Sequence, residues 1–384
     1  AMAIENQAIR DRGFPMKAHA LAGSYAFNQT FIAHPRGSYM GLTMQDGEVM
    51  YDPSFTDNHT QLTAYNIVIG GERSGKSTLA KKNLPPLIAR GDTAWVFDKS
   101  NEWRDLVNMY YGLTLTLDGS QNIINLLQVF GTVLKDNGQI DVIGSFNQHR
   151  SKVITYYATL NPDADKKELQ MVGDLLTDFY IDKRMWSPSP KDNPQDLKII
   201  GLRNDEYPIL EDFLTYLETR NMMTRGMTQP TIERLDNILM TIKSLIQNHG
   251  DMVNGITTMP DLSHERLVRF DTSGLSRLEP DLYNAQYFTI LSLMENYITI
   301  NGTKQRQLIK ENKISIQPNQ PGKQPPKYFW WIQDEADDIF NAKHALGITF
   351  GDNMMAQHGK DFFGMIAIFP GLKNVVPTGQ DRKS

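Results

Sequence analysis

The sequence contains no cysteine, which excludes disulfide bonds, thiolate metal sites and cysteine nucleophiles, and fits a reducing compartment. It has no apolar run near the roughly 20 residues that a membrane-spanning helix needs, and no visible signal peptide. Positive charge is not in excess, since the formal net charge is −5. That balance argues against a strongly basic nucleic-acid-binding domain but leaves room for a local basic channel. The 384 residues are enough for two or three domains.

The strongest functional signal is a glycine-rich stretch. Residues 67–78 read Ile-Val-Ile-Gly-Gly-Glu-Arg-Ser-Gly-Lys-Ser-Thr, and the part from Gly70 to Ser77 fits the pattern G-x-x-x-x-G-K-(S/T) without a mismatch. The apolar run 66–69 before it predicts a buried strand, and the run 78–89 after it predicts a helix. This context favours a phosphate-binding loop over a chance glycine-rich turn.

Each part of this loop has a physical role in such a site. Glycines let the backbone wrap closely around an anion, because no side chain blocks the approach. The loop amides and the N-terminus of the following helix direct partial positive charge at the phosphates. Lys76 should reach the β- and γ-phosphates of a nucleotide, and the Ser77 hydroxyl should ligate Mg2+. The predicted nucleotide-binding residues are Gly70, Gly71, Glu72, Arg73, Ser74, Gly75, Lys76, Ser77 and Thr78.

Strand and helix patterns surround the loop. Upstream, an Asp-Gly turn between two apolar-rich runs predicts a β-hairpin over 38–52. Downstream, 93–98 predicts a buried parallel strand, 101–110 a helix and 113–117 a further strand. The first of these strands ends in Asp98, which either faces the nucleotide at the carboxyl end of the sheet or is a solvated carboxylate or helix cap.

The character changes at residue 141, where helical periodicity takes over. The predicted helices cover 142–159, 166–184, 209–220 and 231–248, with 197–200 as the one strand candidate among them. We therefore predict an all-α subdomain, 141–259, inserted into an α/β core that comprises 4–140 and 260–384.

The α/β pattern resumes after this insertion. We predict strands at 267–271, 328–333 and 364–369, a helix at 282–300 and a long exposed loop at 312–327. Strands that alternate with helices predict a mainly parallel sheet flanked by helices and joined by right-handed crossovers.

A second motif, Tyr-Phe-Trp-Trp-Ile-Gln-Asp-Glu at 328–335, is an apolar strand that ends in two acidic residues, the Walker B pattern. A phosphate-binding loop needs a carboxylate beside its Mg2+, and we assign this role to Asp334. Glu335 would orient and deprotonate the attacking water. The predicted catalytic residues are thus Lys76 and Glu335, and the predicted metal ligands are Ser77 and Asp334. The sequence offers no physical reason for the polar Gln333 at the end of this strand.

These motifs, in this order, resemble the motor domain of the TraC-like, VirB-type ATPases of conjugation and type IV secretion, which belong with the FtsK and HerA pumping motors. The matching features are the hairpin with Gly41 and Tyr51-Asp52, the glycine loop, Phe97 to Trp103, Ile124-Asn125-Leu126, the helical insertion, Phe270 to Leu275, and Ile332 to Ala336.

The resemblance implies a RecA-like P-loop ATPase that binds ATP and Mg2+ and uses hydrolysis to energise channel assembly or substrate transport. It also implies a homo-oligomer, with a hexamer as one form, that meets other channel subunits at the inner membrane face. The full-length protein would then be cytoplasmic and peripherally associated with the cytoplasmic membrane. DNA is a further candidate partner. The opening Ala1-Met2-Ala3 resembles a cloning scar, so we expect a fragment of a longer protein.

The chain also departs from the family. The stretch 354–360 has no arginine where the family carries several, and Phe369-Pro370 stand where the family has Thr-Gln. We therefore expect that an arginine from outside the Walker segments completes the site. In ring-shaped motors of this kind the neighbouring subunit usually supplies it, and the candidates here are Arg234, Arg266, Arg269 and Arg277.

Two rival functions remain open. One is a DNA-pumping translocase or coupling protein of the same superfamily, for which the lysine-rich stretch 304–327 would line a channel; alternatively that stretch is a solvated loop. The other is a structural subunit that binds ATP and hardly turns it over.

Overall fold

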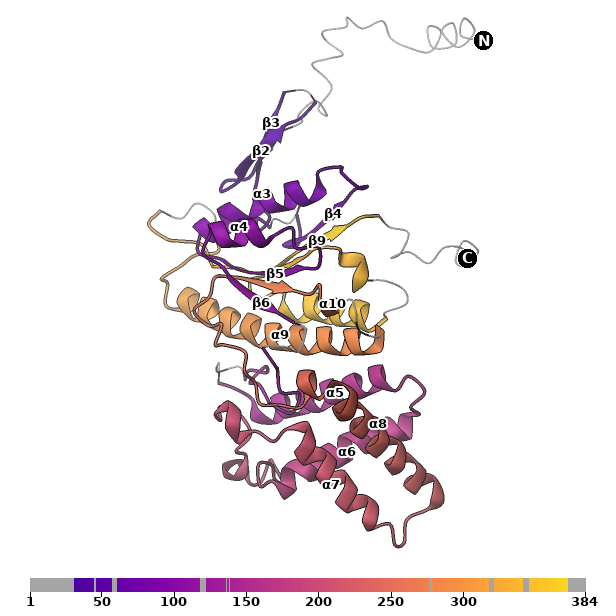
Figure 1. Ribbon diagram of the computed structural model, residues 1–384. Coiled ribbons are helices and arrows are strands. Elements are labelled where there is room, and N and C mark those ends of the chain that lie inside the picture. The colour runs from indigo at the N-terminus through magenta and orange to yellow at the C-terminus, as the bar shows by residue number, and fades with distance from the viewer. Residues whose placement is uncertain are drawn as a thin grey trace, which may run out of the picture. The chain divides into compact units, whose positions relative to one another are not determined.

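The computed structural model describes residues 31–44, 46–56, 61–117, 122–135, 137, 139–275, 278, 280–317, 321–340 and 345–371. Its contacts separate a small unit that ends at Phe55 from a large unit that begins at Thr56 (Figure 1). Among the described helices, none combines the length and the apolar character that crossing a bilayer requires.

The small unit contains a three-stranded sheet of order β1–β3–β2. Strand β2 (Ser38–Leu42) is antiparallel to β3 (Glu48–Tyr51), and β1 (Ile32–Ala33) is parallel to β3. The turn is closed by the Thr43 N–H, which donates to the Gly47 carbonyl at 2.8 Å. The predicted hairpin is therefore confirmed, except that Gln45 lies outside the described residues. Strand β1 was not predicted.

The large unit is built on a six-stranded sheet of order β4–β9–β8–β5–β7–β6, in which every neighbouring pair is parallel. The strands are β4 (Tyr65–Ile69), β5 (Thr93–Asp98), β6 (Leu113–Thr116), β7 (Leu267–Asp271), β8 (Phe329–Gln333) and β9 (Phe363–Phe369). This confirms the predicted parallel sheet. Because all six strands run the same way, their carboxyl ends share one edge.

Helices cover both faces of this sheet, and Figure 1 shows α3 and α4 on one side with α9 and α10 on the other. Alternate residues of each strand divide between two cores. In β5, Ala94 and Val96 pack in the core that includes α3 and α4, and Trp95 and Phe97 in the core that includes α9 and α10. Strands covered on both faces need apolar residues at nearly every position, as here. The helices are α3 (Lys76–Ala89), α4 (Arg104–Met109), α9 (Pro280–Lys310) and α10 (Ala345–His358).

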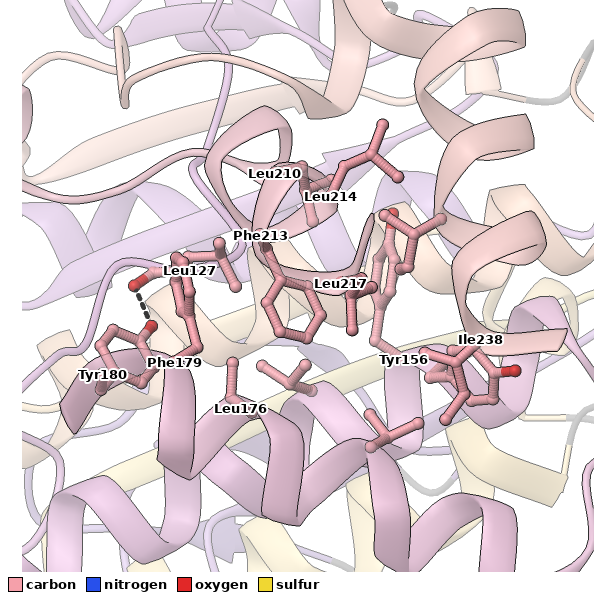
Figure 2. Packing of buried hydrophobic residues seen from close by; sticks show 14 of the residues in the cluster. Leu127, Tyr156, Leu176, Phe179, Tyr180, Leu210, Phe213, Leu214, Leu217 and Ile238 are labelled. Carbon is pink, nitrogen blue, oxygen red and sulfur yellow. Dashed lines mark hydrogen bonds between the residues drawn. The ribbon is translucent and has the colours of Figure 1, made fainter. Parts of the chain in front are cut away.

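Four further helices share a core of their own: α5 (Val142–Leu160), α6 (Lys166–Asp182), α7 (Leu210–Met222) and α8 (Gln229–Val253). Asp141 and Asp165 begin α5 and α6 as N-caps that accept backbone N–H groups. Figure 2 shows Phe179, Phe213 and their neighbours in this core, and the Tyr180 hydroxyl, which donates to the Leu127 carbonyl at 2.5 Å. The four predicted helices are confirmed; the domain boundaries at 141 and 259 stay a prediction.

A buried cluster of charges joins these helices to the sheet layers. Glu295 of α9 is 4% exposed and accepts from Lys152 Nζ at 2.8 Å and from Gln148 Nε2 at 2.6 Å, both on α5. His358, at the end of α10, lies 3.3 Å from the same carboxylate through Nε2 and 2.7 Å from Asp361 through Nδ1. Burial alone would raise the pKa of Glu295, but Lys152 and His358 lower it to about 2. The carboxylate therefore stays charged and ties α5, α9 and α10 together.

Three predictions about elements were wrong in part. Residues 197–200 are not a strand; Ile199 is buried in the core of the four helices, which explains the apolar pattern. Helix α9 extends to Lys310, so the first part of the lysine-rich stretch 304–327 is helical and not a loop. Strand β4 is an edge strand and not a buried one, since Ile67 is 63% and Ile69 50% exposed.

Candidate active site

The predicted loop and the predicted acidic pair lie at the same edge of the sheet. Strand β4 leads into the glycine loop, and β8 leads into Asp334 and Glu335. Only β9 separates these two strands, so their ends are roughly 10 Å apart at about 4.8 Å per strand spacing. Residues more than 250 positions apart in the sequence are thus brought to one place.

The glycine loop is a tight turn that runs straight into α3. Gly75 has a φ of +88° and is the N-cap of the helix, so no side chain caps the first N–H groups of α3. These groups are therefore free to receive an anion from outside the loop. A Cβ at Gly70 would lie 2.3 Å from the Ser74 hydroxyl, so a larger residue there would require the Ser74 side chain to move. The Gly70 N–H donates to the Phe369 carbonyl at 3.2 Å and fixes the loop to the end of β9.

The predicted nucleotide-binding residues differ in exposure. Lys76 and Ser77, on the first turn of α3, are half-buried, as is Gly70. The remaining members of the loop are exposed: Gly71, Glu72, Arg73, Ser74, Gly75 and Thr78. Gly71 has no atom within 4 Å of the position that a Cβ would take, so the backbone there is open to a ligand.

Asp334 is a buried carboxylate with two protein donors. It is 3% exposed; Trp103 Nε1 donates to its Oδ2 at 3.0 Å, and the Glu335 N–H donates to its Oδ1 at 3.2 Å. Burial raises the pKa of Asp334, against the Trp103 hydrogen bond that lowers it, and the nearby Asp98 raises it further. Each carboxylate oxygen can accept more than one hydrogen bond, so a cation-bound water could still be held here.

Asp98 is a structural carboxylate, neither solvated nor open to a nucleotide. It is fully buried and accepts the Trp103 N–H at 3.0 Å and the Glu102 N–H at 3.2 Å, so it holds the turn that precedes α4. It is not a helix cap, because the N-cap of α4 is Trp103 and no side chain caps that helix. Arg269 Nε donates to it at 2.6 Å. Asp98 thereby fixes Trp103, whose indole reaches Asp334. Sequence reasoning included Trp103 in a motif but missed this contact.

The candidate arginines have different positions. Arg269 is 1% exposed and paired with Asp98, so it cannot reach another subunit from this arrangement. Arg234 binds Asp165 with an Nη2–Oδ2 distance of 2.8 Å. Arg266 is exposed and precedes β7, at the edge of the sheet opposite the glycine loop. Arg277 lies outside the described residues.

Glu335 follows directly on Asp334 with its backbone in the left-handed region, at φ 48° and ψ 55°. Its side chain is 40% exposed, and Lys99 Nζ lies 3.7 Å from its Oε2. The same ammonium donates to Asp338 Oδ2 at 2.6 Å, in the short 3-10 helix Ala336–Asp338. Sequence reasoning did not single out Lys99, although its place directly after the strand-ending Asp98 was a signal.

Gln333 supports the acidic pair from within β8. It is 3% exposed, and its Oε1 accepts from the Tyr287 hydroxyl at 2.7 Å and from Trp331 Nε1 at 3.1 Å. Its Nε2 donates to the Asp334 carbonyl at 2.9 Å. The polar side chain thus satisfies two buried donors and fixes the backbone at Asp334, which the sequence could not reveal.

The described residues contain no group of three or more His, Cys, Asp or Glu side chains that could hold a metal ion by themselves. A Mg2+ site in a phosphate-binding loop takes most of its ligands from phosphate and water. The predicted pair Ser77 and Asp334 fits such a site, because the hydroxyl starts α3 and the carboxylate lies at the same edge.

The parallel sheet, the glycine loop entering α3 and the acidic end of β8 define a RecA-like P-loop fold. In particular, the chain has the fold of VirB4 of Thermoanaerobacter pseudethanolicus, with a TM-score of 0.65 and 17% identity over 88% of this chain and 78% of that one. The bacterial conjugative coupling protein TrwB, in its unbound monoclinic form, gives a TM-score of 0.40 and 11% identity over 86% of this chain and 66% of that one.

Sequence comparison finds one informative relative. No protein-family model matches the chain. An uncharacterized protein of Bacillus anthracis, pXO2-09, is 31% identical over 373 residues, which cover 95% of this chain and 56% of that protein. The chain thus spans a little over half the length of this relative.

Proposed function

We propose that this chain is the motor domain of a VirB4-type ATPase of the TraC-like group, which hydrolyses ATP with Mg2+ in conjugation or type IV secretion. The observation that carries the proposal is the placement of the glycine loop and Asp334-Glu335 one strand apart at the carboxyl edge of the sheet. The VirB4 fold supports the same assignment.

The loop would hold the phosphates of the nucleotide. Its exposed backbone and the uncapped first turn of α3 present N–H groups to an anion. Lys76 adds a full positive charge at the start of the same helix. Mg2+, when bound, would neutralise phosphate oxygens, with Ser77 and Asp334 beside it.

Glu335 would act on the attacking water. Phosphoryl transfer needs positioned groups and compensated charge more than covalent chemistry by the protein. Burial raises the pKa of Glu335 from its ordinary value, although Lys99 opposes this. A carboxylate whose pKa is raised towards neutrality is a better proton acceptor than an ordinary glutamate. Half-exposed at the sheet edge, it can take a proton from water and return it to solvent.

The assembly is also part of the proposal. We infer a homo-oligomer, with a hexamer as one form, that meets channel subunits at the inner face of the cytoplasmic membrane. Among the candidate arginines, Arg234 and Arg266 lie at described, partly or fully exposed positions, and Arg269 does not. An arginine from the neighbouring subunit would compensate negative charge on the transferred phosphoryl group and raise the rate about 10³- to 10⁵-fold.

The rival DNA-pumping function has less support. Part of the stretch 304–327 belongs to α9, and Lys313 pairs with Glu311 at 2.6 Å. A lysine paired with an acidic neighbour favours a solvated surface over the wall of a channel that holds DNA.

The test is phosphate release per chain, measured over a wide range of protein concentration with and without DNA. We expect Mg2+-dependent hydrolysis that rises with concentration and is lost in Lys76→Ala. The matched control is Lys82→Ala, an exposed lysine of the same helix. Equal turnover by the wild type and Lys76→Ala would refute the proposal, and stimulation by DNA would favour the pumping motor.

A further inference from the structure

The six parallel strands all begin at one edge of the sheet, opposite the glycine loop, which we call the amino edge. Just before β9, β8, β5 and β7 the chain carries Lys360, Lys327, Arg90 and Arg266. These strands are neighbours in that order, so the cations follow one another along the edge. The buried Asp92 pairs with Arg90 at 3.4 Å. The others leave an excess of positive charge here, although the net charge of the chain is −5.

Two of these cations converge over Gly91, which follows α3 at φ +84°. A Cβ on Gly91 would lie 3.1 Å from Lys327 Nζ and 3.5 Å from Arg266 Nη1, so the ammonium and the guanidinium meet above one backbone position. Among the described residues, Glu265 included, none forms an ion pair or a side-chain hydrogen bond with either charged group. Like charges this close repel each other. An anion between them would remove the repulsion, and phosphate suits a guanidinium and an ammonium together.

The end of α3 does not account for the two cations. Positive charge near the C-terminus of a helix suits its dipole and can hydrogen-bond its last carbonyls. Here those carbonyls already have backbone donors, since the Arg90 N–H donates to Pro86 at 3.1 Å and the Gly91 N–H donates to Ile88 at 2.9 Å. The helix end is therefore complete without the side chains of Lys327 and Arg266.

Apolar side chains stand exposed beside the cations. The parallel register that pairs Leu113 of β6 with Val268 of β7, continued two residues back, sets Tyr111 beside Arg266. Tyr111 is 95% exposed, and Met109 is 70% exposed. Tyr111 also has φ +55°, which is uncommon for an aromatic residue. An aromatic ring held at such a backbone position in water gains nothing within the chain, and this indicates a contact outside it.

We propose that the amino edge binds an anionic membrane surface, with Lys327 and Arg266 on the lipid phosphates and with Tyr111 and Met109 in the interfacial layer. Tyrosine suits that layer, because its ring is apolar and its hydroxyl stays hydrated. A nucleic acid offers the same phosphates, but Met109 favours the membrane, since an apolar side chain gains by leaving water at the acyl boundary and has no donor for phosphate. This inference rests on the membrane attachment within the proposed function and not on ATP hydrolysis.

The first test is flotation of the purified chain with lipid vesicles. One set contains phosphatidylcholine with phosphatidylglycerol, which is anionic, and the other contains phosphatidylcholine alone. We expect binding to the anionic vesicles that weakens as the salt concentration rises, and little binding to the neutral ones. Equal binding to both sets, or none to the anionic set, would refute the proposal.

The second test removes the two convergent charges together, by Lys327→Gln with Arg266→Gln. A basic residue near an anionic surface strengthens binding about fivefold, so we expect the partition to fall roughly 30-fold. The matched control is Arg184→Gln with Lys191→Gln, two exposed cations that follow α6. This control changes the net charge equally and should bind as the wild type does. Equal losses in the two variants would mean that only net charge matters, and the proposed surface would be wrong.

Tyr111→Asn tests the apolar part and decides the question even if the double variant fails to fold. Asparagine tolerates a positive φ, so the backbone is kept while the ring is lost. The partition onto anionic vesicles should fall several-fold with the same dependence on salt, because the charges remain. Unchanged binding by Tyr111→Asn would overturn the proposal.

Two further measurements separate this inference from its alternatives. If the double variant loses affinity for single-stranded DNA and keeps its binding to vesicles, the ligand is a nucleic acid and the proposal is wrong. Lys76→Ala should bind vesicles as the wild type does. A chain that hydrolyses ATP and ignores vesicles refutes only this inference, whereas vesicle binding together with equal turnover by the wild type and Lys76→Ala refutes only the proposed hydrolysis.

Discussion

Replacing Trp103 by phenylalanine tests whether its indole holds Asp334 for metal binding. The change removes the Nε1 donor to the carboxylate at 3.0 Å and leaves an aromatic ring in a fully buried site. A hydrogen bond to a charged group contributes about 1.5–3 kcal/mol. The lost ring volume, roughly 40 Å³, adds about 1 kcal/mol at ~24 cal/mol per Å³. We therefore expect the free energy of unfolding to fall by about 2.5–4 kcal/mol.

The functional effect should exceed what lost stability explains. Residues that orient a metal ligand typically change metal affinity or activity by about 10- to 100-fold when mutated. We expect Trp103→Phe to need at least roughly tenfold more Mg2+ for half-maximal phosphate release. Urea unfolding followed by far-ultraviolet circular dichroism measures the stability, and a Mg2+ titration of hydrolysis measures the function.

Trp330→Phe is a matched control for this experiment. Trp330 is also fully buried, and its Nε1 donates at 3.1 Å to a buried carboxylate, Asp92. Asp92 precedes β5, at the edge of the sheet opposite Asp334. The two variants should lose similar stability, and only Trp103→Phe should change the Mg2+ requirement. Equal Mg2+ requirements in both variants would refute the role assigned to Trp103.

Three further outcomes are expected. Glu335→Gln should bind ATP normally, by calorimetry, and lose at least about 10² in turnover because the amide cannot accept the proton; normal turnover in it, with none in Asp334→Asn, would reverse the two roles. Gln333→Leu should lower the urea unfolding free energy by about 2–4 kcal/mol, because the Tyr287 hydroxyl and a buried indole lose their acceptor; a loss below the error of the measurement would contradict this. Burial lowers the pKa of His149 to about 3, so its contribution to stability is present above pH 6.5 and is lost as the pH falls. Between pH 7.5 and 5, the free energy of unfolding of the wild type should fall by about 2 kcal/mol more than that of His149→Gln. Equal decreases in the two proteins would contradict this prediction.

Local patterns were sufficient to predict most elements and the loop. The phosphate-binding loop is a short contiguous motif, and Gly75 has a positive φ that favours glycine. The helices α5 and α6 each start at an aspartate cap, and β5 and β8 are short apolar runs with clear ends. These signals depend on residues within a few positions of one another.

The missed features depend on contacts between distant residues. Trp103 reaches Asp334 across 231 positions, and Lys99 reaches Asp338 across 239. The edge position of β4 follows from strand order, which apolar content does not encode, so Ile67 and Ile69 were expected to be buried. Gln333 looked anomalous because its partner Tyr287 comes from another element, α9.

The charge cluster at Glu295 holds α5 to α9. To separate α5 from α9, Lys152 must leave a carboxylate that is 4% exposed. Breaking a buried pair in this way costs about 3–5 kcal/mol. The pair therefore opposes separation of α5 from α9. His358 also contacts Asp361, which lies just before β9. The carbonyl of Phe369, the last residue of β9, accepts the N–H of Gly70 in the glycine loop. A separation of α5 from α9 would therefore reach the predicted phosphate-binding loop through a single strand, β9.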